Sequence, residues 1–339
     1  MTAFQVGSLP VYVYGGLVAL AALAALFLMI YTGKKQGLSE GTVSWFAVLA
    51  VPLVFLMARA GYCLANIKWV MERGLGFFFR FTSGGYLLYG GIIGGILAAW
   101  LTAKIAKQPF KRVLDAAAAP AALLIAAGRL AETTIGLGYG YCIEDWFDPW
   151  MEISMIPWEN YDLLYRFPFA VQDYYETWNF AIFLPEALTA LVMLVLLLAM
   201  KKRRDGGAAL LLLLVYACCQ IVFESMRQDQ VIVWGFIRAN QMFSALMIVG
   251  VLLISWQMTK KEERKNKRLF LAFIQILLCA GVVIVMEFAL EQKIAFLAWM
   301  RMDVCYFVMA LACTGLLLTV LPFWRRAFPV ISEKQQKQA

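Results

Sequence analysis

Long apolar runs separated by short polar breaks extend over nearly the whole chain, and this pattern predicts membrane-spanning helices. A helix needs roughly 20 apolar residues to cross about 30 Å of hydrocarbon. Nine runs have about that length, at residues 10–31, 43–65, 84–103, 113–131, 181–200, 207–225, 240–257, 269–290 and 303–323. We therefore predict an all-α, polytopic membrane protein with about nine transmembrane helices.

Clusters of Lys and Arg fall on alternate breaks between these runs. They follow the first, third, fifth, seventh and ninth runs, at Lys34-Lys35, Lys104 to Arg112, Lys201 to Arg204, Lys260 to Arg268 and Arg325-Arg326. Short basic loops beside spans are typical of the cytoplasmic side of a membrane. Nine spans with the N-terminus outside and the C-terminus in the cytoplasm place every cluster on that side.

The break between the fourth and fifth runs, residues 132–180, is too long for a plain connector. Residues 129–180 contain nine acidic and two basic residues, so this segment carries −7 and the rest of the chain +15. The break also holds many aromatic residues, including Tyr139, Tyr141, Trp146, Trp150, Trp158 and Trp178. Tyr and Trp favour the headgroup level of a membrane. We expect an ordered, outward-facing cap rather than a disordered hydrophilic loop.

The composition excludes an ordinary cytosolic enzyme. Hydrophobic residues make up 63% of the chain, charged residues 15%, and the mean hydropathy is +0.73, whereas soluble domains are about half apolar and about a quarter charged. The net charge of +8 resides in short clusters beside apolar runs. That placement favours contact with anionic lipid headgroups, and we expect no nucleic-acid partner.

Histidine is absent from the chain, and none of the seven cysteines forms a CxxC pair. The lack of histidine excludes a serine–histidine hydrolase and a histidine-ligated metalloprotease. The lack of a CxxC pair gives no support for a zinc site or a redox motif, so we expect the cysteines to act as packing residues. We predict no metal and no cofactor. Proton transfer must then use Glu, Asp, Tyr, Lys or a substrate group.

Ionisable residues inside the apolar runs are candidates for function, because burying them in a membrane is costly. They are Arg59, Asp115, Arg129 with Glu132, and Glu224 with Arg227. Each of the two pairs has a three-residue spacing and so shares a helix face. One interpretation is that each pair only neutralises itself. The other is that the arginines converge on a phosphate, which the planar guanidinium binds well.

A glycine-rich run from Gly84 to Gly95 surrounds Tyr89. Gly90 and Gly94, like Gly91 and Gly95, have the GxxxG spacing that allows helices to approach closely in lipid. The alternative to this packing role is that the glycines clear space for a lipid beside Tyr89. The spacing alone does not separate the two.

With these segments in order, residues 10–257 resemble the prolipoprotein diacylglyceryl transferase family. The matching stretches are Val13-Tyr14-Gly15-Gly16-Leu17, Lys34 to Ser39, Ala58-Arg59-Ala60-Gly61-Tyr62, Gly84-Gly85 with Gly90-Gly91, Asp115 with Pro120 and Gly128-Arg129, Glu224 to Arg227, and Asn240 to Ser244. The resemblance divides the chain into a seven-span core at 1–257, a basic loop at 258–268, two additional spans at 269–323 and a basic tail at 324–339.

The resemblance implies transfer of a diacylglyceryl group from phosphatidylglycerol, or a related anionic phospholipid, to the lipobox cysteine of a prolipoprotein in the bacterial cytoplasmic membrane. It implies that Arg129 holds the phosphate with Arg227 or Arg238, that Tyr89 contacts the headgroup, and that Glu132 or Glu224 accepts a proton. The further substrate contacts that it implies are Tyr14, Arg59, Gly85, Gly90, Gly91 and Gly140.

The chain departs from the family pattern at five positions. Tyr89 stands in place of a histidine, Glu132 and Ile135 in place of two asparagines, Leu137 in place of a glutamate, and Gln220 in place of an arginine. Three other functions therefore stay open: a paralogue that uses another lipid or acceptor, a non-catalytic lipid-binding protein, and a transporter or channel.

Overall fold

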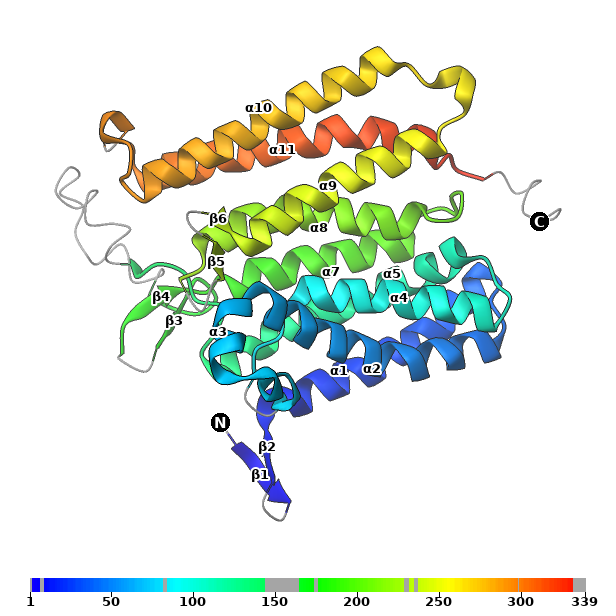
Figure 1. Cartoon of the computed structure of the whole chain (residues 1–339), viewed down its shortest axis with the longest axis horizontal. Coiled ribbons are helices and arrows are strands. Elements are labelled where there is room, and N and C mark those ends of the chain that lie inside the picture. The colour runs from blue at the N-terminus through cyan, green and yellow to red at the C-terminus, as the bar shows by residue number, and fades with distance from the viewer. Residues whose placement is uncertain are drawn as a thin grey trace.

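The computed structural model describes most of the chain (Figure 1). The described residues are 2–6, 9–81, 84–143, 165–173, 176–228, 232–234, 237–297 and 299–331. Of the aromatic residues predicted to lie in the cap, Trp146, Trp150 and Trp158 fall outside these ranges, as does part of the basic tail.

Nine long helices form the body of the described structure. They are α1 (Val13–Gln36), α2 (Glu40–Ala65), α4 (Leu88–Ile105), α5 (Phe110–Ala131), α7 (Phe183–Ala199), α8 (Gly207–Met226), α9 (Ala239–Met258), α10 (Asn266–Leu290) and α11 (Met302–Ala327). Eight of them have the length and hydropathy of a membrane span, and α7 is shorter at 17 residues. The predicted all-helical, polytopic membrane fold is confirmed.

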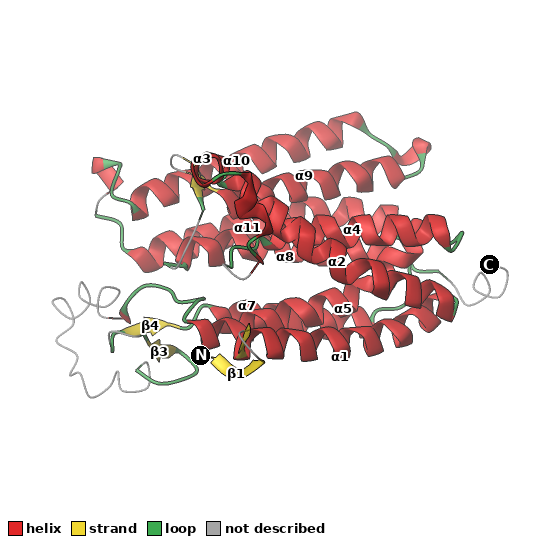
Figure 2. Cartoon of the chain, turned by 60° about the horizontal axis from the view of Figure 1, so that its bottom comes forward, coloured by secondary structure: helices red, strands yellow, loops and turns green. Residues whose placement is uncertain are grey.

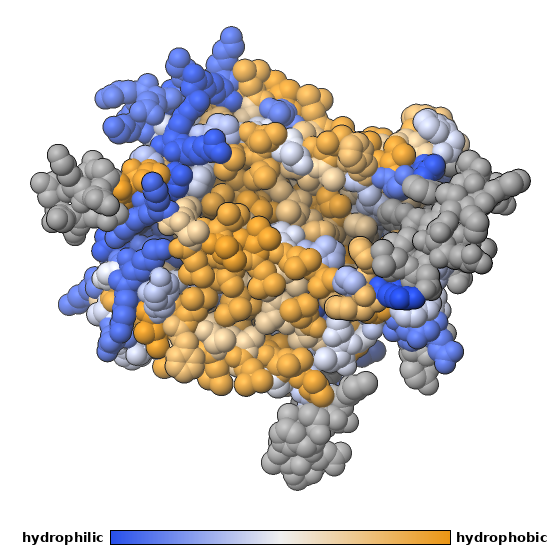
Figure 3. All heavy atoms as spheres, turned by 180° about the vertical axis from the view of Figure 1, so that it is seen from behind, coloured by the Kyte–Doolittle hydropathy of each residue, from blue (hydrophilic) through white to orange (hydrophobic). Residues whose placement is uncertain are grey.

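The helices run side by side, so their ends form two opposite faces of the bundle (Figure 1). Lys104, Lys201, Lys260 and Arg325 lie near the ends of helices on one face, which we call the basic end. We call the opposite face, where the hairpin of strands β3 (Ala170–Gln172) and β4 (Trp178–Phe180) lies, the cap end. Figure 3 shows a wide apolar band between hydrophilic ends. Exposed side chains such as Phe27 and Leu277 contribute to the apolar surface that a lipid bilayer would cover.

The first helix begins later than the sequence predicted. The apolar run starts at residue 10, but Leu9–Tyr12 forms strand β2, which pairs with β1 (Thr2–Val6). The helix α1 begins at Val13. An apolar run alone does not distinguish a strand from the first turn of a helix.

The cap end carries two further short hairpins and one short helix. The hairpins are β3 (Ala170–Gln172) with β4 (Trp178–Phe180), and β5 (Val233–Trp234) with β6 (Ile237–Arg238). The helix α3 (Ile67–Arg73) follows α2 and leads into the 3-10 helix η1 (Leu75–Phe79). Figure 2 shows β3 and β4 beyond the end of the bundle. The described part of the predicted cap thus contains secondary structure, and an ordered, outward-facing cap over residues 132–180 stays a prediction.

The glycine-rich run packs α4 against α2. A Cβ atom at Gly90 would lie 2.3 Å from the carbonyl oxygen of Met57, and one at Gly94 would lie 2.5 Å from that of Leu53. Larger residues at either position would push the two helices apart. The structure therefore supports the packing interpretation for these two glycines.

The last two helices pack on the rest of the bundle through a shared apolar core. Buried residues of α8 and α9, such as Leu214 and Leu252, lie in one cluster with Met309 and Leu316 of α11. At the cap end, the Tyr306 hydroxyl donates a hydrogen bond to the carbonyl oxygen of Ser225, at 3.2 Å. The additional helices are thus an integral part of the described fold.

Asp115 joins two helices at the basic end. Its carboxylate accepts hydrogen bonds from the backbone N–H groups of Gly206 (2.7 Å) and Ala209 (2.9 Å), which lie at the start of α8. The first N–H groups of a helix lack intrahelical partners and favour a negative charge. Asp115 therefore stabilises the start of α8 and ties it to α5.

Candidate active site

Four charged side chains meet at the cap end, where α5, α7 and α8 come together. Arg129 lies 2.7 Å from Glu132 and 3.3 Å from Glu186, and Arg227 lies 3.0 Å from each of the same two carboxylates. Each glutamate therefore contacts both arginines. We call these residues the quartet. Their side chains are between 0 and 15% exposed, with Glu186 the least exposed and Glu132 the most.

The helix ends place the quartet. Arg129 occupies the last turn of α5, and Glu132 opens the 3-10 helix η3 (Glu132–Ile135), which continues from it. Glu186 lies in the first turn of α7, and Arg227 caps the C-terminus of α8. All four residues thus reach the same depth of the bundle from three different helices.

Two glycines hold the segment after η3 close to α7 and α8. The carbonyl oxygen of Gly138 accepts a hydrogen bond from the N–H of Phe183 at 2.9 Å, and Gly140 forms a β-bridge with Arg227. A Cβ atom at Gly140 would lie 2.7 Å from Cγ1 of Ile182. The predicted importance of Gly140 therefore has a steric basis: a larger residue would displace the backbone beside Arg227.

A layer of uncharged polar groups borders the quartet. Gln220 donates hydrogen bonds to Glu186 (3.0 Å) and to Glu224 (3.3 Å), and Asn240 donates a further one to Glu224 (3.0 Å). The Arg129 guanidinium donates to the hydroxyl of Tyr216 at 3.2 Å. Gln220, which stands where the family has an arginine, thus links two carboxylates without adding charge.

Arg238 lies beside the end of α8. Its guanidinium donates to the backbone carbonyl oxygens of Glu224 (2.5 Å) and Arg227 (2.8 Å). It thereby stabilises the backbone that carries Arg227. A direct contact of Arg238 with a phosphate stays a prediction.

Two tyrosines lie near the quartet. The Tyr89 hydroxyl forms a hydrogen bond with Ser244, and its phenol is close enough to interact electrostatically with Arg129. Tyr14 interacts electrostatically with both Arg129 and Glu132. The structure thus brings the predicted residues Tyr14, Tyr89, Arg129, Glu132, Glu224 and Arg227 to one place.

Arg59 has a different environment. Its side chain is buried, and it donates hydrogen bonds to five backbone carbonyl oxygens, those of Phe77, Phe78, Arg80, Gly84 and Gly85. Gly85 has a φ of +80°, and a Cβ atom there would lie 2.5 Å from the ring of Tyr62. These contacts favour a structural role for Arg59 and Gly85, and their role as substrate contacts stays a prediction. A Cβ atom at Gly91 would meet only ordinary contacts, of which the nearest is Cγ1 of Val54 at 3.5 Å.

Glu186 and Tyr216 were not among the site residues expected from the sequence. Glu186 is the only acidic residue in the apolar run 181–200, so the cost of burying an unpaired carboxylate was the signal that marked it. Tyr216 gave no comparable signal, because a tyrosine inside a span is ordinary. Both residues become recognisable once α5, α7 and α8 are assembled.

The two arginines of the quartet have the chemistry of an anion-binding site. Each guanidinium has five N–H donors in a planar fork, which suits carboxylate and phosphate oxygens alike. The carboxylates that now occupy the forks belong to side chains with rotatable bonds. Within the described ranges, no three Cys, Asp or Glu side chains are placed to hold a metal ion. The arginines are therefore suited to bind an anionic group by charge and hydrogen bonds.

Comparison with known proteins gives a consistent result. The family model for prolipoprotein diacylglyceryl transferase matches residues 1–257, so α10 and α11 lie beyond the matched part. Relatives with the name phosphatidylglycerol–prolipoprotein diacylglyceryl transferase occur in Bacillus licheniformis and Clostridioides difficile. The first is 27% identical over 267 residues, which cover 78% of this chain and 94% of the relative. The second is 24% identical over 262 residues, which cover 77% and 96%.

The relative from Symbiobacterium thermophilum has the same name and is 27% identical over 266 residues, which cover 77% of this chain and 94% of that protein. The matched part contains every member of the quartet. Because the family model covers three quarters of the chain, the assignment rests on the whole bundle from α1 to α9. The chain belongs to the prolipoprotein diacylglyceryl transferase family.

Proposed function

We propose that this protein transfers a diacylglyceryl group from a glycerophospholipid to the cysteine thiol of a prolipoprotein. The observation that carries the proposal is the convergence of Arg129 and Arg227 beside Tyr14 and Tyr89 in a protein of this family. The relatives' names give phosphatidylglycerol as donor, and it is the first donor to test. The basic end faces the cytoplasm in this proposal, so the quartet lies near the outer leaflet.

The reaction needs a held phosphate and a free thiol. The cysteine sulfur forms a bond to the terminal glyceryl carbon, while the bond between that carbon and the phosphate oxygen breaks. The electron pair leaves with the phosphate monoester, and the thiol proton passes to that monoester or to a nearby carboxylate. The arginines stabilise the leaving phosphate because their donors are already oriented in a site with little water.

The substrate supplies the nucleophile, so the protein needs no nucleophilic residue of its own. A free cysteine thiol has a pKa of about 8.5, and nearby guanidinium groups lower such a value. In this proposal, Tyr14 and Tyr89 contact the headgroup or the glyceryl oxygens. Glu132 and Glu186 are the carboxylates that contact the arginines of the quartet, and in this proposal Glu132 or Glu224 accepts the proton.

A direct assay tests the proposal. Purified protein in an uncharged detergent is incubated with phosphatidylglycerol, phosphatidylethanolamine and a lipobox peptide. We expect the peptide to gain the mass of one diacylglyceryl group, with release of a water-soluble phosphate monoester. The variant R129A, purified in the same way, provides the inactive control. A peptide of unchanged mass with every lipid would refute the transferase proposal.

A second function, lipid binding without catalysis, has support from the charge balance of the quartet and from two replaced residues. Glu132 and Glu186 neutralise both arginines of the quartet from within the chain, and Tyr89 and Gln220 replace a histidine and an arginine of the family pattern. A protein that only holds a lipid needs neither of the replaced groups. In the same assay, such a protein would retain phospholipid through purification and release no phosphate monoester.

A further inference from the structure

A hollow at the basic end is lined by residues of α1, α5, α7 and α8 and of the segment that joins α7 to α8. Its volume is about 540 Å³, part of which is open to solvent. We call it the basic pocket. Because the quartet lies at the cap end, the basic pocket belongs to a different part of the molecule.

Packed helices form the walls of the basic pocket. Both α1 and α7 pack against α5 (Figure 2), and α5 contributes the buried residues Asp115 and Ala119 to the lining. The side chain of Lys35, on α1, donates a hydrogen bond to the carbonyl oxygen of Leu198, on α7, at 2.8 Å. The pocket is therefore part of the helical bundle and not only a gap between surface loops.

The lining carries an excess of positive charge. One of its residues is acidic, Asp115, and four are cationic, namely Lys35, Lys201, Lys202 and Arg203. The carboxylate of Asp115 already binds backbone N–H groups at the start of α8. Among the residues that the structure describes, none of the four cations forms an ion pair. Four positive charges and one negative charge give the lining a net charge of +3.

Arg203 shows the effect of this excess. Its guanidinium lies over the ring of Trp324 and donates to the carbonyl oxygen of Phe328 at 2.8 Å, so two neutral groups hold it. Partial burial and the positive charge of Arg325 lower the pKa of this guanidinium. A negative charge in the pocket would offset the repulsion between the two arginines.

Part of the lining is apolar and leads toward the surface that a bilayer would cover. Leu197 and Met200 line the pocket beside its lysines. Next to the lining residues in the chain, Tyr31 on α1 and Leu196 on α7 are 59% and 53% exposed. A free phosphate ion gains nothing from this apolar border, whereas a phospholipid places its acyl chains along it. The combination of cations and apolar surface favours a lipid.

We infer that the basic pocket binds the phosphate group of an anionic phospholipid, whose acyl chains lie against α1 and α7. Lys201, Lys202 and Arg203 surround the phosphate, and the lipid joins α1 to α7. In the orientation proposed above, the pocket lies at the cytoplasmic leaflet, whose anionic lipids attract clusters of Lys and Arg. This lipid is a bound ligand at the basic end and is distinct from the donor lipid at the cap end.

Photolabelling tests the inference, because it shows where on the protein a lipid binds. The purified full-length protein in an uncharged detergent receives phosphatidylglycerol with a photoreactive group next to its phosphate, and labelled peptides are mapped by mass spectrometry. We expect label on the lining residues of α7 and of the segment between α7 and α8. Absence of label there would overturn the inference, whatever label the cap end acquires.

A pair of double variants tests the assigned charges. K201Q/K202Q removes two lysines whose side chains form no hydrogen bond or ion pair within the described ranges, so we expect it to fold normally. The matched control K260Q/K261Q removes two exposed lysines at the same end of the bundle, after α9. We expect the amount of lipid at half-maximal labelling of the pocket to rise at least about tenfold in K201Q/K202Q, or about 1.4 kcal/mol, and less than about twofold in the control. An equal change in both would show unspecific attraction and contradict the inference.

Three competitors identify the source of the phosphate. Unlabelled phosphatidylglycerol should abolish the label at the pocket, and an equal amount of zwitterionic phosphatidylcholine should leave most of it. Inorganic phosphate should have no effect, because it makes no use of the apolar border. If inorganic phosphate competes as well as phosphatidylglycerol, the pocket holds a free phosphate, and if phosphatidylcholine does so, the charge is irrelevant. Either result would refute the inference.

The variant Q36E provides a second test if K201Q/K202Q aggregates. Gln36 lines the pocket, and its side chain forms no hydrogen bond within the described ranges. The new carboxylate competes with the phosphate for the lysines, so we expect the same weakening of the label as in K201Q/K202Q. Unchanged labelling of folded Q36E would contradict the inference. None of these measurements uses turnover, so failure of the transferase proposal would leave their outcome valid.

Discussion

Two groups of buried arginines at the cap end differ in the partners that hold them. Arg59 donates its hydrogen bonds to five backbone carbonyl oxygens around η1 and the start of α4. Arg129 and Arg227 instead contact two glutamate side chains. From the sequence, Arg129 and Arg227 were candidates for phosphate binding and Arg59 for another substrate contact, because all three lie within or at the end of an apolar run.

The difference concerns which partner a ligand can replace. Backbone carbonyl groups are fixed by the fold, so a phosphate cannot displace them from Arg59 without unfolding the segment that they belong to. A carboxylate side chain can rotate away and yield its place on a guanidinium to another anion. Arg59 is therefore suited to hold residues 77–80 and 84–85 in place, and the quartet is suited to exchange ligands.

The largest effect is expected for R59A. Loss of the guanidinium removes a donor from five backbone carbonyl groups, although that of Phe77 still accepts from the N–H of Arg80. Each buried group that is left unsatisfied costs about 1–3 kcal/mol. We expect the variant to be recovered as aggregate or with a much lower melting temperature, measured by intrinsic fluorescence in detergent. The control R326A removes an exposed arginine at the basic end and should melt like the unchanged protein. A normal melting curve for R59A would show that the carbonyl contacts contribute little.

The second effect concerns activity rather than folding. In R129A, Arg227 still contacts both carboxylates, so we expect a folded protein with a normal gel-filtration profile. Loss of a donor that stabilises the leaving phosphate lowers turnover at least about 10²-fold. The measurement is the rate of peptide modification at saturating lipid. Unchanged turnover in R129A would remove this arginine from the phosphate site.

A smaller effect is expected at the opposite end of the bundle, where the carboxylate of Asp115 binds backbone N–H groups instead of arginines. The variant D115A loses this cap at the start of α8. We expect a loss of about 1–2 kcal/mol in the free energy of unfolding, as for other capping residues. Turnover should not change, because the quartet lies at the cap end. A loss of turnover without a loss of stability would contradict the assigned role.

The sequence was sufficient to predict the helices but not the partners of their polar residues. Each long helix coincides with an apolar run of the sequence, because a backbone that is buried in lipid has to form a helix. The arginines were identified for the same reason, since charges in such runs are rare. Their environments were not predictable, because the carbonyl groups around Arg59 carry no sequence signal and Glu186 approaches Arg129 only after α5 and α7 pack.

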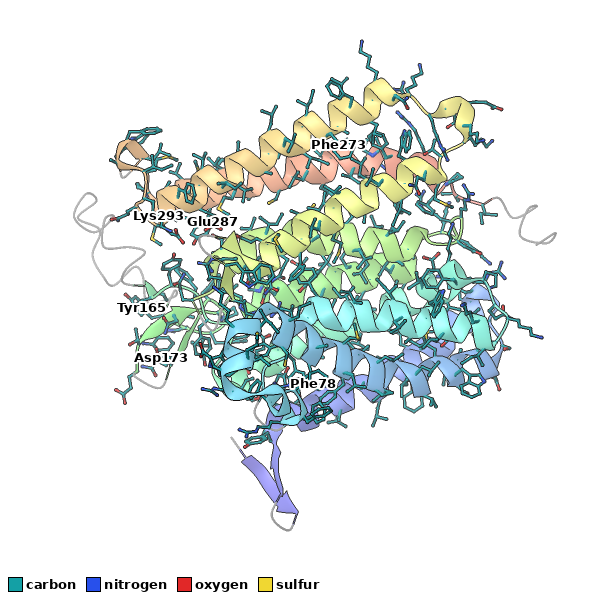
Figure 4. The ribbon with its side chains drawn as sticks, viewed as in Figure 1. Phe78, Tyr165, Asp173, Phe273, Glu287 and Lys293 are labelled. Carbon is teal, nitrogen blue, oxygen red and sulfur yellow. The ribbon has the colours of Figure 1, made fainter. Side chains whose placement is uncertain are left out.

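The contact between Gln241 and Glu287 could not be predicted from the sequence for the same reason. The two residues are 46 positions apart, and nothing in either apolar run indicates that they form a hydrogen bond. Figure 4 labels Glu287 near the cap end of α10, outside the part that the family model matches. Gln241 also donates to the carbonyl oxygen of Ile221, which lies on α8. The contact therefore connects the additional helices to the helix that carries Gln220 and Glu224.

The smallest effect is expected when this contact is removed. In E287L, Gln241 loses one acceptor and keeps the carbonyl oxygen of Ile221, so it is not left unsatisfied. We expect a loss of about 0.5–1.5 kcal/mol in the free energy of unfolding, the usual net value of one hydrogen bond. Turnover should fall much less than in R129A, because the quartet keeps all its contacts. If E287L instead lowers turnover as far as R129A does, the additional helices hold Gln241 for the reaction itself, and exchangeable contacts at the cap end extend beyond the quartet.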